Sequence, residues 1–101
     1  MRYHARVDGN QGPIVQAIRA CGGSWADTHA VGNGCVDGFS GWFGRYTIPC
    51  EIKSDKGTLT EDEEDFHKAW RGTPIEILRS QEDVIRLRDR LVLQMAREEG
   101  R

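Results

Sequence analysis

The sequence predicts one small α/β domain whose elements follow each other in the order α-β-β-β-α-β-α. Three observations support this: the chain has 101 residues, enough for one domain with one modest core. Residues 45–53 alternate between apolar and other side chains, as a strand does. Two later segments begin with capping residues, as helices do. Residues 1–101 are expected to form this domain, with a core at about 6–95 and a frayed tail at 98–101.

The first expected helix begins near Asn10, a residue that caps helices, and tolerates Pro13 in its first turn. Two consecutive glycines, Gly22 and Gly23, are expected to end it. The apolar side chains that recur at helical spacing are Ile14, Ile18 and Cys21.

Two short strands are expected after this helix. The first spans residues 24–30 and is followed by a Gly-Asn-Gly turn at residues 32–34. The second spans residues 36–39, and the Ser-Gly pair at residues 40–41 predicts a further turn. A turn over residues 41–44 would allow the second strand to pair with the one that follows it.

The clearest strand lies at residues 45–53. Its alternation places Glu51 and Lys53 together on the face opposite the core. Pro49 conflicts with a central position, because proline cannot donate to a ladder and prefers edges or bulges. The apolar residues expected to face the core are Tyr46, Ile48, Cys50 and Ile52.

A capping box formed by Thr60 and Glu63 predicts a helix over residues 61–70. Acidic residues fill its first turns, which suits the positive end of a helix dipole. Gly72 is expected to end this helix. Residues 54–70 carry six acidic and two basic side chains, so the acidic excess of the chain concentrates here.

The remaining expected elements are a strand over residues 73–78 and a last helix. Ser80 with Asp83 predicts the start of that helix. Its apolar stripe consists of Val84, Leu87, Leu91 and Met95.

Composition indicates a small cytoplasmic domain. The formal net charge is -2, which argues against a wholly basic surface but allows a local basic patch. No apolar run approaches the roughly 20 residues of a membrane span, and no hydrophobic leader follows Met1. The three cysteines have no CxxC spacing and are expected to be reduced thiols rather than zinc ligands or a nucleophile.

One group of residues has the composition of a metal-dependent hydrolytic site. If the strands at residues 36–39 and 45–53 pair, Asp37 approaches Glu51, and two close carboxylates repel unless a cation lies between them. Mg²⁺ commonly takes one or two carboxylates. Lys53, on the face of Glu51, suits a role beside a water or a phosphate. The alternative is that these three side chains only solvate an exposed face.

Several segments in order resemble the PD-(D/E)XK nuclease superfamily, more narrowly the small standalone VRR-NUC-type nucleases of phages and bacteria. The resemblance covers about residues 6–85. The segments that carry it are RVDGNQ at 6–11, GNGCVDG at 32–38, CEIK at 50–53, LT at 59–60, FH at 66–67, WRG at 70–72 and RSQED at 79–83.

The resemblance implies a restriction-endonuclease-like fold, with a central mixed sheet flanked by helices, and a site for Mg²⁺ or Mn²⁺. Asp37, Glu51 and the backbone carbonyl of Ile52 would bind the metal, and Lys53 would position or activate water. Gln11 matches a glutamate of related nucleases and is a possible further ligand, or simply a helix-capping residue. Glu63 departs from the pattern, where relatives often carry glutamine; an added carboxylate there either strengthens metal binding or repels phosphate.

A second departure is Val36, which replaces the usual proline before the aspartate. The proline shapes backbone rather than chemistry, so its loss has little consequence.

The function expected from the resemblance is a metal-dependent DNA endonuclease that hydrolyses phosphodiester bonds. Such minimal nucleases resemble structure-specific enzymes that act on duplex or branched DNA, such as Holliday junctions, as homodimers. The expected DNA contacts are Arg6, Lys56 and His67. The alternative for His67, which the sequence favours, is a plain histidine on the helix surface or at the edge of the core. The Trp42–Phe43 pair at a glycine-flanked turn is a candidate dimer contact or base-stacking wedge.

The alternative is a catalytically inactive nuclease fold that binds DNA or protein, including a phage regulator of a host protein. In either case the chain would work in the cytoplasm, that of the bacterial host if a phage encodes it.

Overall fold

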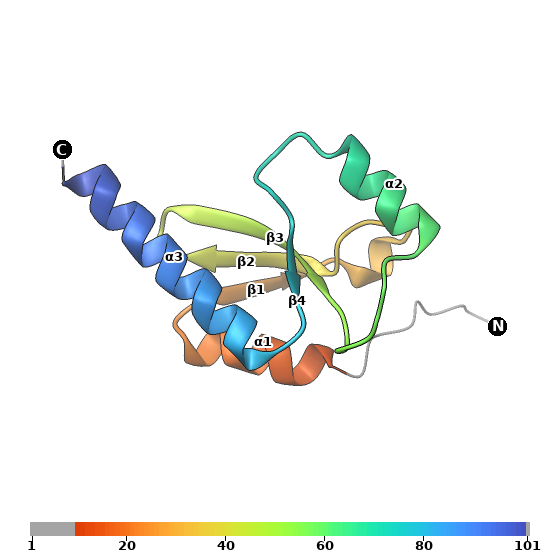
Figure 1. Cartoon of the computed structure of the whole chain (residues 1–101), viewed down its shortest axis with the longest axis horizontal. Helices are drawn as coiled ribbons and strands as arrows, with labels where there is room; N and C mark the ends of the chain where they lie inside the picture. The colour runs from red at the N-terminus through yellow and green to blue at the C-terminus, as the bar shows by residue number, and fades with distance from the viewer. Residues whose placement is uncertain (1–9, 101) are drawn as a thin grey trace.

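Three α-helices and four strands follow each other along residues 10–100, the part of the chain that the computed structural model describes (Figure 1). Expectations for residues 1–9 and 101, including the DNA contact of Arg6, lie outside this range. The helices are α1 (Gln11–Ala20), α2 (Glu61–Ala69) and α3 (Gln81–Glu99), with a 3₁₀ turn η1 (His29–Val31). The strands are β1 (Ser24–Asp27), β2 (Gly38–Trp42), β3 (Tyr46–Ile52) and β4 (Glu76–Leu78).

The strands form one mixed sheet in the order β1-β2-β3-β4. β1, β2 and β3 are antiparallel neighbours, whereas β4 lies parallel to β3. A parallel pair needs a long crossover, which here contains α2. The predicted α/β class is therefore confirmed. Figure 1 shows that α2 lies apart from α1 and α3.

The hydrophobic core lies where α1 and α3 pack against the sheet. Of the four even-numbered residues of β3, Ile48, Cys50 and Ile52 belong to this core and Tyr46 packs against it, as predicted. Pro49 and Glu51 on the other face of the strand are buried as well. Burial raises the pKa of the Cys50 thiol to about 11, so this thiol stays protonated. The buried helical side chains of the core are Ile14, Val15, Ala17, Ile18, Val84, Leu87 and Leu91.

The first strand is shorter than the predicted residues 24–30. β1 ends at Asp27, whose Oδ1 accepts a hydrogen bond from the backbone N–H of His29 at 3.0 Å. An aspartate that bonds to the backbone two residues ahead turns the chain. The segment expected to continue the strand therefore forms η1 instead.

The turn predicted at Ser40–Gly41 is wrong, because both residues lie within β2 and pair with β3. The expected pairing of the two strands through the segment 41–44 is confirmed, since Trp42 pairs with Tyr46. The chain reverses at Phe43 and Gly44, which have φ of 58° and 65°. Positive φ at two consecutive residues is typical of a type I′ hairpin turn. Trp42 is only 2% exposed, so of the proposed exposed aromatic pair only Phe43 reaches the surface, at 40%.

Phe43 occupies a conformation that suits asparagine or glycine better than an aromatic residue. Phe43→Asn is therefore expected to stabilise the fold by about 0.5–1 kcal/mol, because Asn-Gly is the preferred type I′ pair. Urea unfolding followed by circular dichroism measures the change. Phe43→Leu, which keeps an apolar side chain in the strained position, serves as the control and should give no gain. A destabilised asparagine variant would show that the ring contact of Phe43 with Trp42 matters more.

Pro49 lies in a central strand without breaking its ladder. The backbone carbonyl of Cys50 accepts from Asp37 N, so the polar groups of Cys50 are directed toward β2. Those of Pro49 are then directed to the opposite side, toward β4. Pairing with β4 begins only at Cys50, so the missing N–H falls just before the parallel ladder starts.

α2 begins as predicted. Thr60 and Glu63 form a complete capping box, in which each side chain bonds to the backbone of the other. The helix ends at Ala69, and Trp70 already has extended backbone angles. The strand predicted at residues 73–78 is shorter in the structure, where it is β4, because only three of its residues pair with β3.

α3 begins at its predicted cap, where Ser80 Oγ accepts from Asp83 N. The predicted frayed tail is wrong for residues 98 and 99. The helix continues through Glu99, and Arg45 binds both Glu98 and Glu99, at 3.3 and 3.0 Å. These ion pairs join the helix end to the start of β3. Among residues 10–100, no helix is both long and apolar enough to cross a membrane.

Candidate active site

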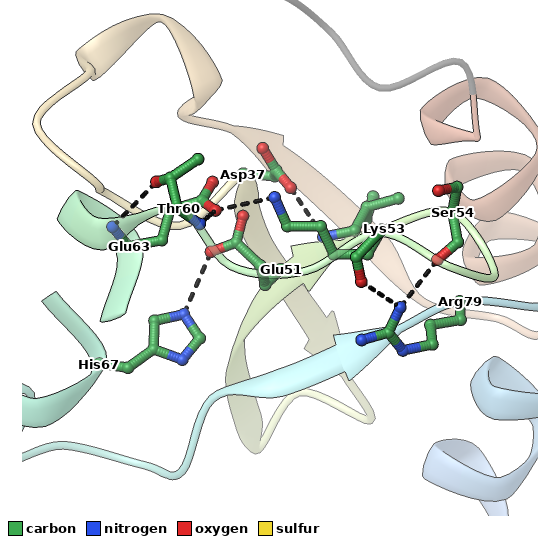
Figure 2. Close-up of polar contacts among 10 residues, drawn as sticks. Asp37, Glu51, Lys53, Ser54, Thr60, Glu63, His67 and Arg79 are labelled. Carbon is green, nitrogen blue, oxygen red and sulfur yellow. Dashed lines mark hydrogen bonds and ion pairs between the residues drawn. The ribbon is translucent and has the colours of Figure 1, made fainter. Parts of the chain in front are cut away.

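Asp37 and Glu51 come together because β2 and β3 pair. The register joins Gly38 to Cys50, so the residues just beyond this pair, Asp37 and Glu51, are cross-strand neighbours. Asp37 Oδ2 accepts a hydrogen bond of 2.7 Å from the backbone N–H of Ile52 (Figure 2). This bond ties the Asp37 carboxylate to the end of β3.

Glu51 is fully buried, with 0% of its surface exposed, so the alternative of a solvated carboxylate is wrong for this residue. Its Oε1 lies 3.2 Å from His67 Nε2. Its Oε2 accepts no hydrogen bond within residues 10–100, and when the group is protonated, Asp37 and Glu63 are the acceptors nearby. Burial and the neighbouring Asp37 charge raise the pKa of Glu51 to about 9. Without a cation, Glu51 therefore stays protonated at neutral pH.

Asp37 is less enclosed than Glu51 but has the same kind of environment. Burial raises the pKa of Asp37 above its ordinary value, even though the hydrogen bond from Ile52 opposes this shift. Two adjacent carboxyl groups with raised pKa values form a site that favours the binding of either protons or a cation.

Lys53 lies beside this carboxyl pair and is held by α2. Its Nζ donates to Glu63 Oε1 at 2.8 Å, and the same oxygen accepts from Thr60 N in the capping box (Figure 2). Burial alone would lower the pKa of Lys53, but the contact with Glu63 outweighs it and raises that pKa. Burial would raise the pKa of Glu63, but its bonds from Lys53 and Thr60 lower it. Lys53 and Glu63 are therefore a charged pair.

The backbone after Lys53 is held by two polar side chains that sequence reasoning missed. Asn10 Nδ2 donates at 2.9 Å to the carbonyls of Lys53 and Arg79. Asn10 makes no side-chain cap on α1, contrary to the prediction. The Arg79 guanidinium donates to the carbonyls of Ser54 at 2.8 Å and Gly57 at 2.7 Å (Figure 2). The end of β3 and its following loop are thus fixed in position.

Gln11 lies against β1. Its Nε2 donates to Asp27 Oδ2 at 2.7 Å, while its buried Oε1 has no hydrogen-bond partner within residues 10–100. Asp27 also binds His29, which lowers the pKa of Asp27 although burial raises it. The structure thus shows a contact of Gln11 with Asp27 and not a helix cap; its role as a metal ligand stays a prediction.

The residues predicted to contact DNA differ in their surroundings. Lys56 is exposed in the loop after β3 and remains a candidate. His67 contacts Glu51 instead of pointing freely into solvent. Glu63 and His67 are four residues apart on α2 and so share one helix face. That spacing, together with the capping box, was the sequence signal for their common position.

The donor set can be compared with the needs of a divalent cation. No three His, Cys, Asp or Glu side chains in residues 10–100 are grouped to hold a metal ion. Asp37 and Glu51 offer two carboxylates, and the carbonyl of Ile52 is directed to the same side as its N–H, which bonds Asp37. The buried unpartnered Glu51 Oε2 fits a cation that takes two carboxylates and keeps several waters.

No family model, curated protein or solved structure matches the chain. The chemistry of the site therefore rests on its own residues.

The contact between Lys53 and Glu63 leads to a prediction about both neighbours. Glu63→Gln keeps the capping box, which accepts glutamine, but removes the charge. The pKa of Lys53 and the pKa of Glu51 are both expected to fall, since Glu63 raises each of them. NMR titration of the lysine Nζ and the carboxyl carbons measures these changes. Glu64→Gln, an equal charge change at an exposed position of the same helix, should shift neither. An unchanged Lys53 pKa in Glu63→Gln would show that the ion pair is absent in solution.

Proposed function

We propose that this chain is a Mg²⁺- or Mn²⁺-dependent DNA endonuclease that hydrolyses phosphodiester bonds. The observation that carries the proposal is the buried Glu51, whose Oε2 has no hydrogen-bond partner within residues 10–100, directly beside Asp37 and Lys53. A fully buried carboxyl group with a pKa near 9 destabilises a protein at neutral pH unless something binds there. Residues that lower the stability of the folded protein in this way are typical of functional sites.

The residues have separate roles in this proposal. Asp37, Glu51 and the carbonyl of Ile52 would hold the metal, with Gln11 a possible further ligand. When bound, the metal supplies Lewis-acid chemistry that activates water and neutralises phosphate charge. Lys53 would donate hydrogen bonds to the attacking water or to a phosphate oxygen. Its ammonium group has three donors, so it can do this while one of them remains on Glu63.

The arrangement of the elements supports a restriction-endonuclease-like core as part of the proposal. Asp37 immediately precedes β2, and Glu51, Ile52 and Lys53 lie at the end of the adjacent β3. This placement puts all four groups at one end of two paired strands. The PD-(D/E)XK pattern requires such an aspartate and such an acidic-x-lysine segment.

DNA binding in this proposal depends on a few basic side chains and on a second copy of the chain. Lys56 is exposed beside the site, and Arg6 and His67 are the other proposed contacts. The net charge of -2 and the acidic first turns of α2 make one copy a weak DNA-binding surface. A homodimer would place two sites on a two-fold substrate such as a duplex or a four-way junction.

The second candidate function is a nuclease-like fold that binds DNA or protein without cleaving. The observation that favours it is the ion pair between Lys53 and Glu63, which engages the proposed catalytic lysine. The exposed acids of α2 close to the site would also repel phosphate. Mn²⁺ titration by calorimetry separates the candidates, because a pure binding module does not need metal at Asp37 and Glu51.

A cleavage panel tests the proposed function. Single strands, duplex, flaps and four-way junctions are incubated with Mg²⁺ or Mn²⁺, with Lys53→Ala as the control protein. Cleavage of at least one substrate by the wild type but not by the variant supports an endonuclease. If Mn²⁺ does not bind, the metal site is wrong and the pure binding module is favoured. If Mn²⁺ binds but no substrate is cut by the wild type, the endonuclease proposal fails for these substrates.

A further inference from the structure

His67 is the α2 residue that contacts the buried carboxyl group of the candidate site. Its Nε2 lies 3.2 Å from Glu51 Oε1, with 18% of the His67 side chain and none of the Glu51 side chain exposed. Figure 2 shows the imidazole directed from α2 toward Glu51 on β3. The two residues belong to different elements, so their contact depends on how α2 sits over β3.

The position of α2 is set largely by polar contacts. None of its residues is fully buried, so no apolar side chain inserts from it into the core. Glu63 binds Lys53 and His67 binds Glu51, both from one face of the helix. The helix therefore presents its polar face to Glu51 of β3 and to Lys53 just after it, the two residues that carry the proposed chemistry.

The contact distinguishes the two oxygens of Glu51. Oε1 faces the imidazole, while Oε2 is buried and has no hydrogen-bond partner within residues 10–100. A carboxylate that binds a cation can only accept hydrogen bonds, so the ring must then present its Nε2–H to Oε1. That bond restricts rotation of the carboxylate and leaves Oε2 as the atom available to a metal.

We propose that His67 is a positioning residue that orients the Glu51 carboxylate for metal binding. This inference rests on the proposed function, since it assumes a metal at Asp37 and Glu51. It replaces direct DNA contact as the main role of His67. Partners that orient a metal ligand typically contribute 10–100-fold to metal affinity.

The experiment measures Mn²⁺ affinity by isothermal titration calorimetry in the absence of DNA. Three substitutions are compared: His67→Gln, His67→Asn and His67→Leu. The glutamine amide reaches about as far as the imidazole Nε2, whereas the asparagine amide reaches only to the Nδ1 position. We expect His67→Gln to bind Mn²⁺ nearly as tightly as the wild type. His67→Asn and His67→Leu should bind it about 10–100-fold more weakly.

Cleavage kinetics provide a second readout. The Mn²⁺ concentration needed for half-maximal cleavage should rise in His67→Asn, while kcat at saturating Mn²⁺ stays near the wild-type value. Lys68→Leu, an exposed substitution on the same helix, controls for changes in α2 and should behave like the wild type. Circular dichroism establishes that each variant is folded.

The outcomes separate the two proposals. If the wild type binds Mn²⁺ and His67→Asn binds it equally well, His67 does not position Glu51 and the inference is wrong. Unchanged Mn²⁺ affinity with weaker DNA binding would assign His67 to the substrate instead. If the wild type itself binds no Mn²⁺, the proposed function fails, and the inference that depends on it fails too.

Discussion

Replacing Lys53 with alanine is expected to lower metal-dependent DNA cleavage by about two to four orders of magnitude, the usual contribution of a positioned proton donor. The reason is that Lys53 is a cation whose charge interacts with both Asp37 and Glu51. Asp37→Asn should cause a comparable loss, because it removes a metal-binding charge but keeps an oxygen that can accept from Ile52 N. Cleavage rates at saturating Mg²⁺ or Mn²⁺ measure both effects.

The fold should survive these changes. Lys53→Ala breaks an ion pair with Glu63 whose side chains are only 13% and 16% exposed, so the cost lies between that of a surface pair and that of a buried one, at about 1–3 kcal/mol. Lys68→Ala removes the same charge from an exposed position of α2 and is the matched control, expected to retain full activity. Thermal unfolding separates lost chemistry from lost structure. Full cleavage by either Lys53→Ala or Asp37→Asn would contradict the assignment of the site.

Glu51→Gln is expected to stabilise the metal-free protein at pH 7 while abolishing metal binding. The pKa of Glu51 is about 9 in the folded chain and 4.5 ordinarily. Between these values the folded chain keeps a proton that the unfolded chain releases. The stability that depends on this proton is fully present below pH 4.5 and is lost as the pH rises toward 9. Glutamine needs no proton and avoids this loss.

The stabilisation expected for Glu51→Gln follows from the difference between pH 7 and the ordinary pKa of 4.5. Keeping a carboxyl group protonated at pH 7 costs about 3 kcal/mol, so Glu51→Gln should gain about 2–3 kcal/mol. The gain corresponds to roughly 10–20 °C in Tm for a domain of this size, and it should nearly vanish at pH 4.5. Thermal unfolding in EDTA at several pH values measures it.

Addition of Mn²⁺ should reverse the order of stability of the wild type and Glu51→Gln. Mn²⁺ should raise the Tm of the wild type, because a ligand that binds only the folded state stabilises it, and leave Glu51→Gln unchanged. Glu64→Gln, which removes a carboxylate from an exposed position, controls for net charge. A Glu51→Gln variant that is less stable than the wild type at pH 7 would show that the carboxyl group is not a burden to the folded chain.

Local patterns predicted most of the secondary structure because they act over a few residues. The alternation in β3 placed Glu51 and Lys53 on one face, and the box of Thr60 and Glu63 marked the start of α2. The predictions were wrong where residues distant in the sequence determine where a helix or strand ends. β4 stops where β3 no longer pairs with it, and the end of α3, at Glu98 and Glu99, contacts Arg45 from the segment before β3.

The candidate site was likewise predictable in part from the sequence. Pairing of β2 with β3 was enough to expect Asp37 near Glu51, and the structure brings them together. The burial of Glu51 was not predictable, since its position on the face opposite the core suggested solvent. On that face Glu51 meets His67 of α2 and the carboxyl group of Asp37, which are distant from it in the sequence.

By itself, the sequence determined the order of helices and strands and the placement of three potentially reactive side chains on neighbouring strands. Periodicity and capping are local, so they are encoded within each segment. Only the tertiary structure decided that Lys53 meets Glu63, that His67 meets Glu51, and that Asn10 and Arg79 hold the end of β3. These contacts join residues from different elements, so no single segment of the sequence encodes them. Burial is also the largest cause of the raised pKa of Glu51, and it too arises only from the folded structure.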